Sequence, residues 1–460
     1  MEETKTLAAN CMNIDFESLP ESTIDRAKYF LLDYIGVAAR GALSDSSKMV
    51  HTLLADLNPV DKGVVIIGTT LKSSPAYAAI ANGAASHSLE MDDVTNEASL
   101  HPAVAIMSAA FDASHHCNAS GRRFIEAIVA GYEVMIRLGI CLNPSAHYKQ
   151  GFHPTATCGT FGSAVTAGKL LGLNQADMVN AMGIAGSQAA GSMEFLTGGA
   201  YTKRLHPGWA AHAGIIAAML AKYGFTGPDT IIEGQTGFLK AYSNQSDLSK
   251  LLTNWGSPYK IEQNSIKPHS CCRYIQGPLD CILEIIGRNS LKPADIETVT
   301  VAVLKTGIPI VAQPRELKFN PRSVVDAQFS MPFGAAVAIL NGKATLDEYI
   351  EKNLTDPAVR EMMDRIVCVQ DDALETEFPR KWPAKVSIRT KAGKEYETRI
   401  DFPKGDPENP LSWDELTAKF KNLTSSVFTK SRVEEIVTRI RGLETEKNMA
   451  SFSEILAGNR

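Results

Sequence analysis

The stretch GRRFIEAIVAGYEVMIRL, residues 121–138, decides the fold class of this chain. Its length and its mixture of apolar and small residues indicate a helix that packs closely against its neighbours. The same texture recurs from about residue 22 to residue 255, with Gly or Asn between the segments. Further helices are therefore predicted at residues 22–39, 104–113, 162–171, 174–187, 209–223 and 226–233.

The sequence changes character after about residue 267. Residues 296–304 alternate between apolar and polar side chains, as a strand does, and residues 384–400 indicate a β-hairpin with a Gly-containing turn. Helices are predicted between these strands, at residues 326–340 and 346–353.

A turn-rich stretch, residues 403–410, precedes a capping box at Ser412 and Glu415 that starts a new helical segment. About 50 residues are few for an independent domain, so this tail is expected to pack on the helical part. The predicted fold is mainly α, with a large all-helical domain (residues 1–266), a smaller α+β domain (267–402) and C-terminal helices that return to the helical domain (403–460).

The composition is that of an ordinary soluble globular protein, with 44% apolar residues, 21% charged residues and a formal net charge of −5. Lys and Arg are scattered along the chain, so a nucleic-acid partner is not expected. No apolar run reaches the roughly 18 residues of a membrane span, and the N-terminus lacks a signal-peptide pattern. We therefore expect a cytoplasmic protein without a membrane partner. The eight cysteines show no disulfide-framework spacing, which predicts free thiols.

All ten histidines lie between His51 and His269. Five of them belong to short polar islands within sequence that is otherwise rich in Ala and Gly. Burying titratable groups costs several kcal/mol unless they are paired, so these islands are candidates for a functional site. The islands are residues 87–102, 151–154, 201–208 and 267–274.

Two His-Pro steps, His101-Pro102 and His153-Pro154, predict imidazoles at helix starts, because proline moves the preceding residue out of helical geometry. A neutral or tunable imidazole there is suited to general acid or base catalysis. The first island also carries four carboxylates between Glu90 and Glu97. A metal, a cationic partner or plain solvent exposure could each compensate for them.

Lys203 and Arg204 are predicted to lie in a turn directly before the helix at residues 209–223. Cations beside a helix N-terminus favour binding of a carboxylate or phosphate, with a solvated charged turn as the alternative. The island KPHSCCRY, residues 267–274, lies at the predicted domain boundary, where ligand sites are common. Its adjacent Cys271 and Cys272 are expected to be packed, because the sequence lacks C-x-x-C and H-E-x-x-H metal motifs.

The sequence contains neither a P-loop nor a strand–G-x-G-x-x-G–helix pattern, which disfavours nucleotide and nicotinamide chemistry. Acid–base chemistry on an anionic substrate, without a cofactor, is the function class that remains.

Taken together, the islands resemble the MmgE/PrpD family over nearly the whole chain. The resemblance implies a large helical domain built from both termini, a smaller α+β lid domain and a homodimer. It also implies a catalytic pocket between domain and lid that holds no metal, iron–sulfur cluster or other cofactor. The matching motifs are Asn82-Gly83 with His87 and Asp92-Asp93, His101-Pro102, residues 151–154 followed by 159–163, Lys203 with Ala210-Ala211, Gly237-Phe238, and residues 267–272.

The resemblance also implies residue roles. It places Asp93, His101, His153 and Lys203 among the catalytic residues, with His269 as their counterpart on the lid side. In the resulting hypothesis, the two helix-start histidines exchange protons and Asp93 orients a histidine. The expected substrate-binding residues are Arg204, Lys267, Arg273 and Tyr274, and the expected supporting residues are His87, Asp92 and His206.

The expected function is that of a cofactor-independent lyase acting on a small di- or tricarboxylate, such as cis-aconitate or 2-methylcitrate, by dehydration or decarboxylation. An epimerase or isomerase of a dicarboxylate such as iminodisuccinate could use the same groups. A catalytically silent polycarboxylate-binding protein is the alternative from another class. The sequence leaves the choice of substrate open, because selectivity depends on the shape of the pocket.

Overall fold

A computed structural model describes the chain except residues 1, 58–59, 61, 196–199, 379 and 459–460. The fold is mainly α, and the chain forms two compact units. The first, here called the helical unit, comprises Met1–Asn264 and Ser412–Arg460, and the second, the α+β unit, comprises Ser265–Leu411. Among the described residues, no helix is long and apolar enough to cross a membrane.

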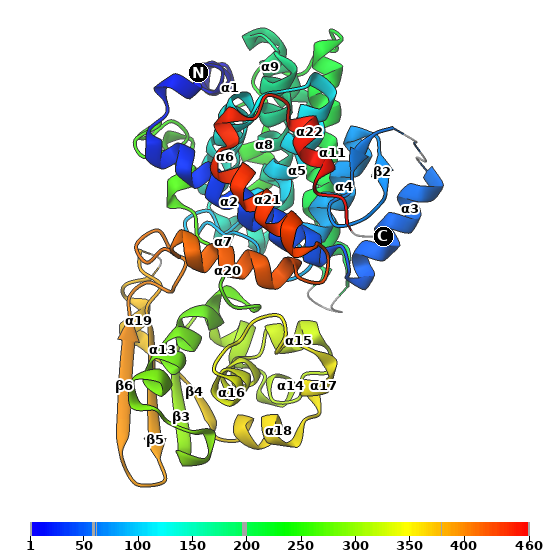
Figure 1. Cartoon of the computed structure of the whole chain (residues 1–460). Coiled ribbons are helices and arrows are strands. Elements are labelled where there is room, and N and C mark those ends of the chain that lie inside the picture. The colour runs from blue at the N-terminus through cyan, green and yellow to red at the C-terminus, as the bar shows by residue number, and fades with distance from the viewer. Residues whose placement is uncertain (1, 58–59, 61, 196–199, 379, 459–460) are drawn as a thin grey trace. The chain divides into compact units, whose positions relative to one another are not determined.

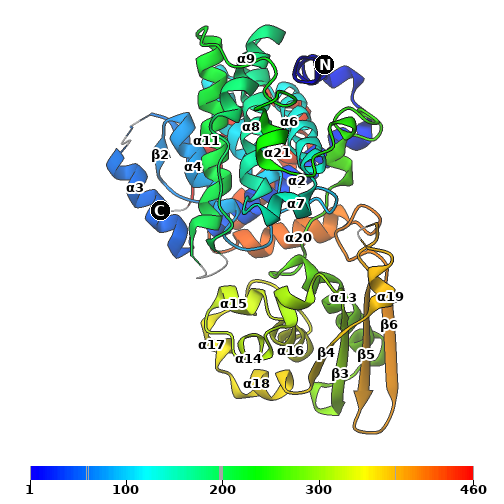
Figure 2. The ribbon, with the colours of Figure 1, turned by 180° about the vertical axis from the view of Figure 1, so that it is seen from behind.

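The helical unit is built around α8 (Pro154–Leu171), which packs against α5 (Ala103–Cys117), α6 (Gly121–Leu142) and α11 (Thr202–Lys222). α11 also packs against α4 (Pro75–Ser86), as Figures 1 and 2 show from opposite sides. A Cβ on Gly208 of α11 would lie 2.2 Å from the main-chain oxygen of Ile80 in α4. Only glycine permits this approach, so the small residues of the sequence do serve tight helix packing.

Other helices surround these and complete the unit. The first of the C-terminal helices, α20 (Trp413–Thr424), packs against α2 (Glu21–Gly41), and its capping box between Ser412 and Glu415 is formed as predicted. The unit also contains a small antiparallel pair, β1 with β2, so the prediction of an all-helical domain is wrong in this detail. The other α-helices and strands described in this unit are α1 (Glu3–Met12), α3 (Asp45–Leu57), β1 (Val64–Val65), β2 (Lys72–Ser73), α7 (Pro144–Lys149), α9 (Gln175–Gly186), α12 (Phe238–Tyr242), α21 (Lys430–Arg441) and α22 (Met449–Glu454).

The helix predicted at residues 162–171 begins earlier, at Pro154, and two further predicted segments of the helical unit differ in the structure. α11 begins at Thr202, so Lys203 and Arg204 lie in its first turn and not in a loop before it. Pro207 is tolerated inside this helix because it removes a single backbone hydrogen bond, the one to the carbonyl of Lys203. Residues 226–228 have no regular structure and residues 229–233 form turns, so the helix predicted at 226–233 is not formed. The main-chain N–H of Gly227 donates to the side chain of Asn180 at 3.1 Å.

The α+β unit contains a four-stranded sheet in the order β4-β3-β5-β6. β3 (Ile296–Val303) pairs in parallel with β4 (Ile366–Gln370) and antiparallel with β5 (Ala384–Thr390), and β5 forms a hairpin with β6 (Glu395–Ile400). The predicted strand and hairpin are therefore confirmed. α13 (Arg273–Asn289) packs against this sheet, and α16 (Met331–Asn341) packs against α13 and α18 (Pro357–Met363).

The helix predicted at residues 326–340 is interrupted. It consists of α15 (Val324–Gln328) and α16, because the Ser330 side chain caps a new helix by accepting from the N–H of Phe333 at 3.2 Å. Of the segment predicted at 346–353, only its end is helical, as α17 (Glu351–Leu354). Two further short α-helices described in this unit are α14 (Arg315–Lys318) and α19 (Asp372–Glu375).

Candidate functional site

The candidate site of the helical unit is organised by the loop that joins α4 to α5. α4 ends at Ser86, His87 follows as its C-cap, and α5 starts at Ala103. Within this loop Glu90 and Ser99 adopt left-handed backbone conformations, with φ of 54° and 51°. Each costs a residue with a side chain about 1–2 kcal/mol, so the surroundings must hold the loop in this shape.

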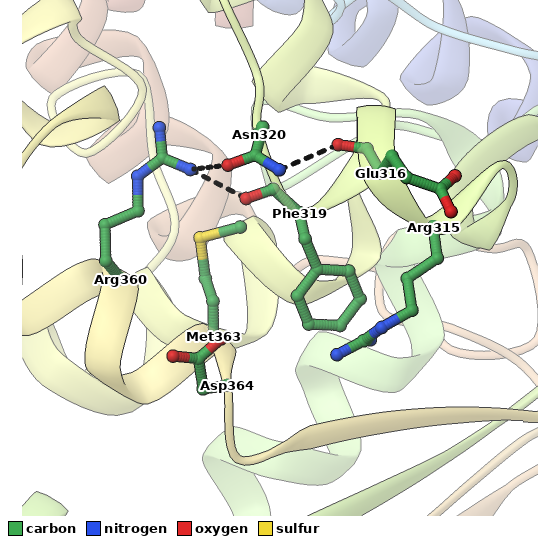
Figure 3. Close-up of a pocket in the computed structure, with 7 residues that line it drawn as sticks. All are labelled: Arg315, Glu316, Phe319, Asn320, Arg360, Met363 and Asp364. Carbon is green, nitrogen blue, oxygen red and sulfur yellow. Dashed lines mark hydrogen bonds between the residues drawn. The ribbon is translucent and has the colours of Figure 1, made fainter.

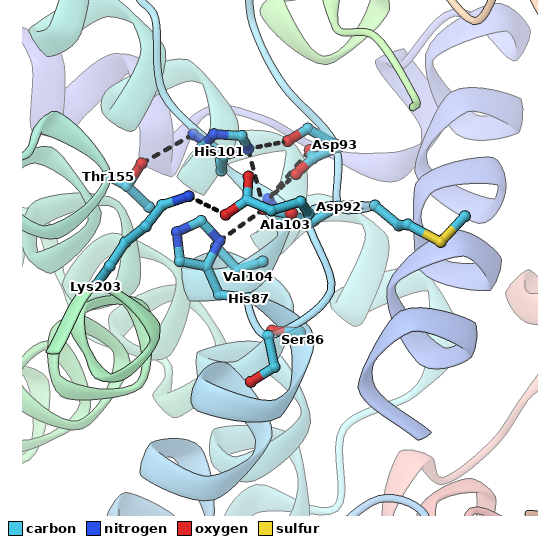
Figure 4. Close-up of polar contacts among 12 residues, drawn as sticks. Ser86, His87, Asp92, Asp93, His101, Ala103, Val104, Thr155 and Lys203 are labelled. Atoms are coloured by element: carbon cyan, nitrogen blue, oxygen red, sulfur yellow. Dashed lines mark hydrogen bonds and ion pairs between the residues drawn. The ribbon is translucent and has the colours of Figure 1, made fainter. Parts of the chain in front are cut away.

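Asp92 binds two histidines at the centre of the loop (Figure 4). Its Oδ2 lies 2.8 Å from Nδ1 of His87 and 3.0 Å from Nδ1 of His101. An ionised carboxylate only accepts hydrogen bonds, so both imidazoles carry their proton on Nδ1 when they bind it. Burial lowers the pKa of His87 to about 4, so this ring is neutral at pH 7 and keeps a lone pair on Nε2.

Asp93 has different partners from its neighbour. Its carboxylate accepts from the N–H of Ala103 at 3.0 and 3.1 Å, from the Tyr132 hydroxyl at 2.8 Å, and from the side chain of Asn264. Burial raises the pKa of Asp93 to about 8, while the bonds from Tyr132 and Ala103 oppose that rise. The Asp93 carboxylate thus holds the start of α5. It is the main-chain oxygen of Asp93 that lies 2.6 Å from Nδ1 of His101.

His153 and His206 extend the group of imidazoles. His153 is the N-cap residue of α8, as its His-Pro step predicts, and its Nδ1 lies 3.0 Å from Nδ1 of His206 in α11. The ring centroid of His87 lies 5.9 Å from that of His153 and 5.1 Å from that of His101. Burial lowers the pKa of His153 well below its usual value and that of His206 to about 4. Three of these four clustered rings are therefore neutral at pH 7.

Lys203 supplies a cation beside the imidazoles. Its ammonium forms an ion pair with Glu90, and its positive charge helps to lower the pKa of His87 and of His153. Arg204, the next residue of α11, donates to the Ser46 hydroxyl at 3.1 Å. The structure thus brings together Lys203 and the predicted His87, His101, His153 and His206, a set that combines a cation with groups able to move protons.

The other predicted residues belong to the α+β unit. His269 Nε2 lies 2.9 Å from Oδ1 of Asp280, and Lys267 is buried. Arg273 pairs with the buried Asp406, at 2.5 and 2.6 Å, and its guanidinium lies over the ring of Trp382. Tyr274 packs against the same Trp382 ring, at 5.0 Å between centroids. Arg273 and Tyr274 therefore contribute to the packing of their own unit.

The cysteines of this island, Cys271 and Cys272, lie in the hydrophobic core of the α+β unit, which confirms the prediction that they are packed. Burial raises the pKa of the Cys271 thiol, so it is a poor source of thiolate. The same unit carries an open depression of about 420 Å³ (Figure 3). Two arginines and two carboxylates line this depression, so its wall has no excess of positive or negative charge. None of its lining residues belongs to the predicted site. Its lining residues are Arg315, Glu316, Phe319, Asn320, Arg360, Met363 and Asp364.

Residues 5–251 match the MmgE/PrpD N-terminal domain, and residues 269–444 match the MmgE/PrpD C-terminal domain. The chain belongs to the MmgE/PrpD family. A cis-aconitate decarboxylase of Aspergillus terreus is 28% identical over 96% of this chain and 94% of its own length. The cis-aconitate decarboxylase of Mus musculus is 26% identical, over 99% and 93%. The 2-methylcitrate dehydratase of Cupriavidus necator is 23% identical, over 79% and 76%. The family resemblance recognised in the sequence is confirmed.

One group in this MmgE/PrpD chain could be considered as a metal centre. Among the residues that the structure describes, His87, Asp92 and His101 bring three possible ligand atoms within 4.8 Å of one another. Two imidazoles and a carboxylate suit a transition metal. However, Nδ1 of each histidine already lies within 3.0 Å of Oδ2 of Asp92, and the positive charge of Lys203 lowers the pKa of His87 and disfavours a second cation. A hydrogen-bond network explains the cluster, and the metal-free site stays a prediction.

Sequence reasoning missed several residues of the site. Tyr132 and Asn264 bind Asp93 from α6 and from the end of the first segment of the helical unit. Lys419 of α20 donates to the main-chain oxygen of Met91 at 2.8 Å. Glu90 was visible as one carboxylate of the first island, but its partner Lys203 lies 113 residues away. None of these pairs has a local sequence signal.

Proposed function

We propose that this protein is a cofactor-independent lyase that acts on a small tricarboxylate, by dehydration or decarboxylation. The observation behind this proposal is the cation of Lys203 beside the imidazole cluster that Asp92 orients. Such a reaction needs positive charge to hold carboxylates next to groups that move protons. The relatives named above are cis-aconitate decarboxylases and a 2-methylcitrate dehydratase, which supports a lyase of this class.

In this proposal the roles follow from chemistry and position. Lys203 and Arg204 hold substrate carboxylates, and substrate displaces Glu90 from the ammonium of Lys203. His101 and His153 exchange protons with the reacting carbon or with the leaving hydroxyl. His101 can accept a proton on Nε2 because its Nδ1 proton is held by the main-chain oxygen of Asp93 at 2.6 Å, with Oδ2 of Asp92 at 3.0 Å. Asp93 acts indirectly, by holding the start of α5 next to His101.

The decisive experiment combines a substrate panel with a variant. Wild-type protein is given 2-methylcitrate, citrate, cis-aconitate and iminodisuccinate in deuterated buffer, and the products are followed by NMR. We expect loss of water or carbon dioxide from one of the tricarboxylates. His153→Ala should lower kcat roughly 10²–10⁴-fold, the usual contribution of a positioned acid or base. His116→Ala, a histidine exposed on α5, is the matched control. Wild-type turnover by His153→Ala would refute the assignment.

The same experiment separates the alternatives. An epimerase or isomerase would place solvent deuterium in recovered substrate without loss of water or carbon dioxide. A silent polycarboxylate-binding protein would bind one of the acids, with saturation, and convert none. The pairing of a cation with movable protons at one place favours the lyase over simple binding, which needs only the cation.

We further propose that the α+β unit acts as a lid that supplies His269 and Lys267 to the substrate. The family resemblance supports this role, and both residues lie in the island that matches the family motif. Lys267→Met should raise KM for the acid that the panel identifies, and Lys343→Met, an exposed lysine of the same unit, should not. Equal KM values for the two variants would contradict the lid.

A homodimer is also proposed. Met49, Leu53 and Leu57 follow one another at intervals of four residues on α3, with 60%, 49% and 61% of their surface exposed. An apolar stripe of this kind is typical of a surface that a partner covers. Sedimentation should give a dimer for the wild type and a monomer for Met49→Glu with Leu53→Glu. A cytoplasmic location stays a prediction that cell fractionation can check.

A further inference from the structure

We propose that His206 is the proton-relay partner of His153, and that a proton passes between their Nδ1 atoms to connect the buried ring with the protein surface. This inference deepens the proposed function, because it takes His153 as a group that exchanges a proton with substrate. His206 is in hydrogen-bond contact with His153, and in this proposal it acts through that neighbour and not on the substrate itself.

The geometry of the pair carries the inference. The two Nδ1 atoms are 3.0 Å apart, although the residues are 53 positions apart in the sequence. Two lone pairs or two N–H groups would repel at this distance, so a single proton lies between the rings. If His153 donates it, Nε2 of His153 is a base; if His206 donates it, Nε2 of His153 carries a proton and is an acid. The position of one proton thus sets the catalytic state of His153.

The surroundings give the two rings different access to solvent. His153 is 3% exposed, and its main-chain N–H donates to the carbonyl of Gly191 at 3.0 Å. His206 is partly exposed. Phe195 packs edge-on against both rings, at 5.9 Å from each centroid. A proton taken up by the buried ring therefore needs a second group to reach water, and His206 is in hydrogen-bond contact with it.

Charge explains why a relay is needed. Burial and the neighbouring His87, His206, Lys203 and His101 all lower the pKa of His153, so an imidazolium at this position is strongly disfavoured. His206 is kept neutral in the same way, by burial and by His87 and Lys203.

The nearby carboxylates have other partners. Asp92 binds His87 and His101, and Glu90 binds Lys203. His153 can therefore take a proton readily only if it gives another one away in the same event.

The proton balance is simple. A substrate C–H proton moves to Nε2 of His153, the Nδ1 proton of His153 moves to Nδ1 of His206, and the Nε2 proton of His206 moves to water. One proton leaves the substrate, and both rings stay neutral with their tautomers exchanged. The reverse sequence delivers a solvent proton. Decarboxylation requires the reverse sequence once per turnover, because carbon dioxide leaves its bonding electron pair on the substrate and carbon then takes up a proton. After the product leaves, a proton from water on Nε2 of His153 and the forward sequence restore both tautomers with no net change in protons.

Two variants separate relay from positioning. His206→Asn keeps an amide near the Nδ1 position and can hold the His153 ring, but an amide cannot pass a proton on. We expect its kcat to fall about 10²-fold, with KM within about 3-fold of wild type. Imidazole added to His206→Ala should restore turnover about 10-fold with saturation, since it can replace the missing ring. Wild-type kcat in His206→Asn, or no rescue of His206→Ala, would overturn the relay.

A second measurement does not depend on turnover. ¹⁵N spectra of the histidine rings in the resting protein report the tautomer of each ring, and the His153→Asn and His206→Asn variants assign the two signals. At pH 7 we expect two neutral rings of opposite tautomer, one protonated on Nδ1 and the other on Nε2. Two Nε2 tautomers, or an imidazolium, would refute the relay. If no acid of the panel is converted, the proposed function fails while this measurement still judges the pair.

Discussion

Replacing Lys419 by Met tests whether the C-terminal helix holds the site loop in place. The Lys419 ammonium lies 2.6 Å from Oδ1 of Asp33 in α2 and 2.8 Å from the main-chain oxygen of Met91. The side chains of Lys419 and Asp33 are 7% and 2% exposed. Met91 stands between Glu90, with its left-handed backbone, and Asp92, which binds the histidines. One ammonium therefore connects α20, α2 and the loop.

The expected loss of stability follows from burial. Met fills a similar volume without charge, so Lys419→Met leaves the Asp33 carboxylate buried without its cation, which costs about 3–5 kcal/mol. The lost hydrogen bond to Met91 adds about 1 kcal/mol. Adding Asp33→Asn removes the buried charge, and replacing both partners of a buried pair is much less costly than replacing one. The double variant should therefore recover at least about 2 kcal/mol.

Urea unfolding gives the free energies for this double-mutant cycle, and turnover of the accepted acid gives the functional effect. Lys421→Met, an exposed lysine on the same helix, is the control and should unfold like the wild type. The double variant should regain stability, but its kcat should stay about 10-fold below that of the wild type. The main-chain oxygen of Met91 still lacks its hydrogen bond from Lys419, and small displacements of catalytic groups lower the rate. A single Lys419→Met variant within about 1 kcal/mol of wild type would refute the estimate of the buried pair. A wild-type kcat in the destabilised Lys419→Met variant would refute the role of Lys419 in positioning the loop.

Three further predictions concern the imidazole cluster. The pKa of His87 falls from its ordinary 6.5 to about 4 on folding, so the contribution of His87 to the free energy of unfolding should be constant above pH 6.5 and drop by about 3 kcal/mol on acidification to pH 4. His87→Gln should flatten this dependence in urea titrations, and an unchanged slope would contradict it. Lys203→Met should lower kcat/KM at least about 10²-fold, whereas Lys222→Met, at the exposed end of the same helix, should not. Equal effects of the two substitutions would exclude a specific role for the positive charge of Lys203. Dialysis against EDTA should leave turnover unchanged. A loss of turnover that Zn²⁺ restores would instead show that the protein needs a metal, for which His87, Asp92 and His101 are the candidate ligands.

The helices of the core were predictable because their length and small residues are local properties. Their ends were not. α8 begins at Pro154, at a His-Pro step that was itself noticed, and proline is favoured at the first position of a helix. α11 was predicted to start after Pro207, because proline and the glycines around it are typical of a turn. Packing of α11 against α4 and α8 outweighs the one hydrogen bond that Pro207 removes.

The site was predictable as a set of residues and not as a geometry. Polar islands in apolar sequence can be found by inspection. Whether their side chains come together in space depends on how the helices α4, α5, α8 and α11 pack against one another. One of these crossings places Gly83 of α4 against Gly208 of α11, where a Cβ on Gly83 would lie 2.5 Å from the opposite Cα. Tyr132 lies within an apolar helix, where an aromatic residue is usually part of the core. Lys419 is 328 residues away from the carbonyl that it binds.

The adjacent Asp92 and Asp93 show where inference from sequence reaches its limit. Both are buried carboxylates in the same loop, and nothing in their order says which one meets the histidines. The structure separates their carboxylates: Oδ2 of Asp92 lies within 3.0 Å of Nδ1 of His87 and of His101, and the carboxylate of Asp93 binds the first turn of α5 and Tyr132. Only the main-chain oxygen of Asp93 reaches His101. A shift of the loop by one residue would exchange these partners. The left-handed Glu90 just before them and the Lys419 bond to Met91 hold the register, so the division of roles depends on residues outside the acidic pair.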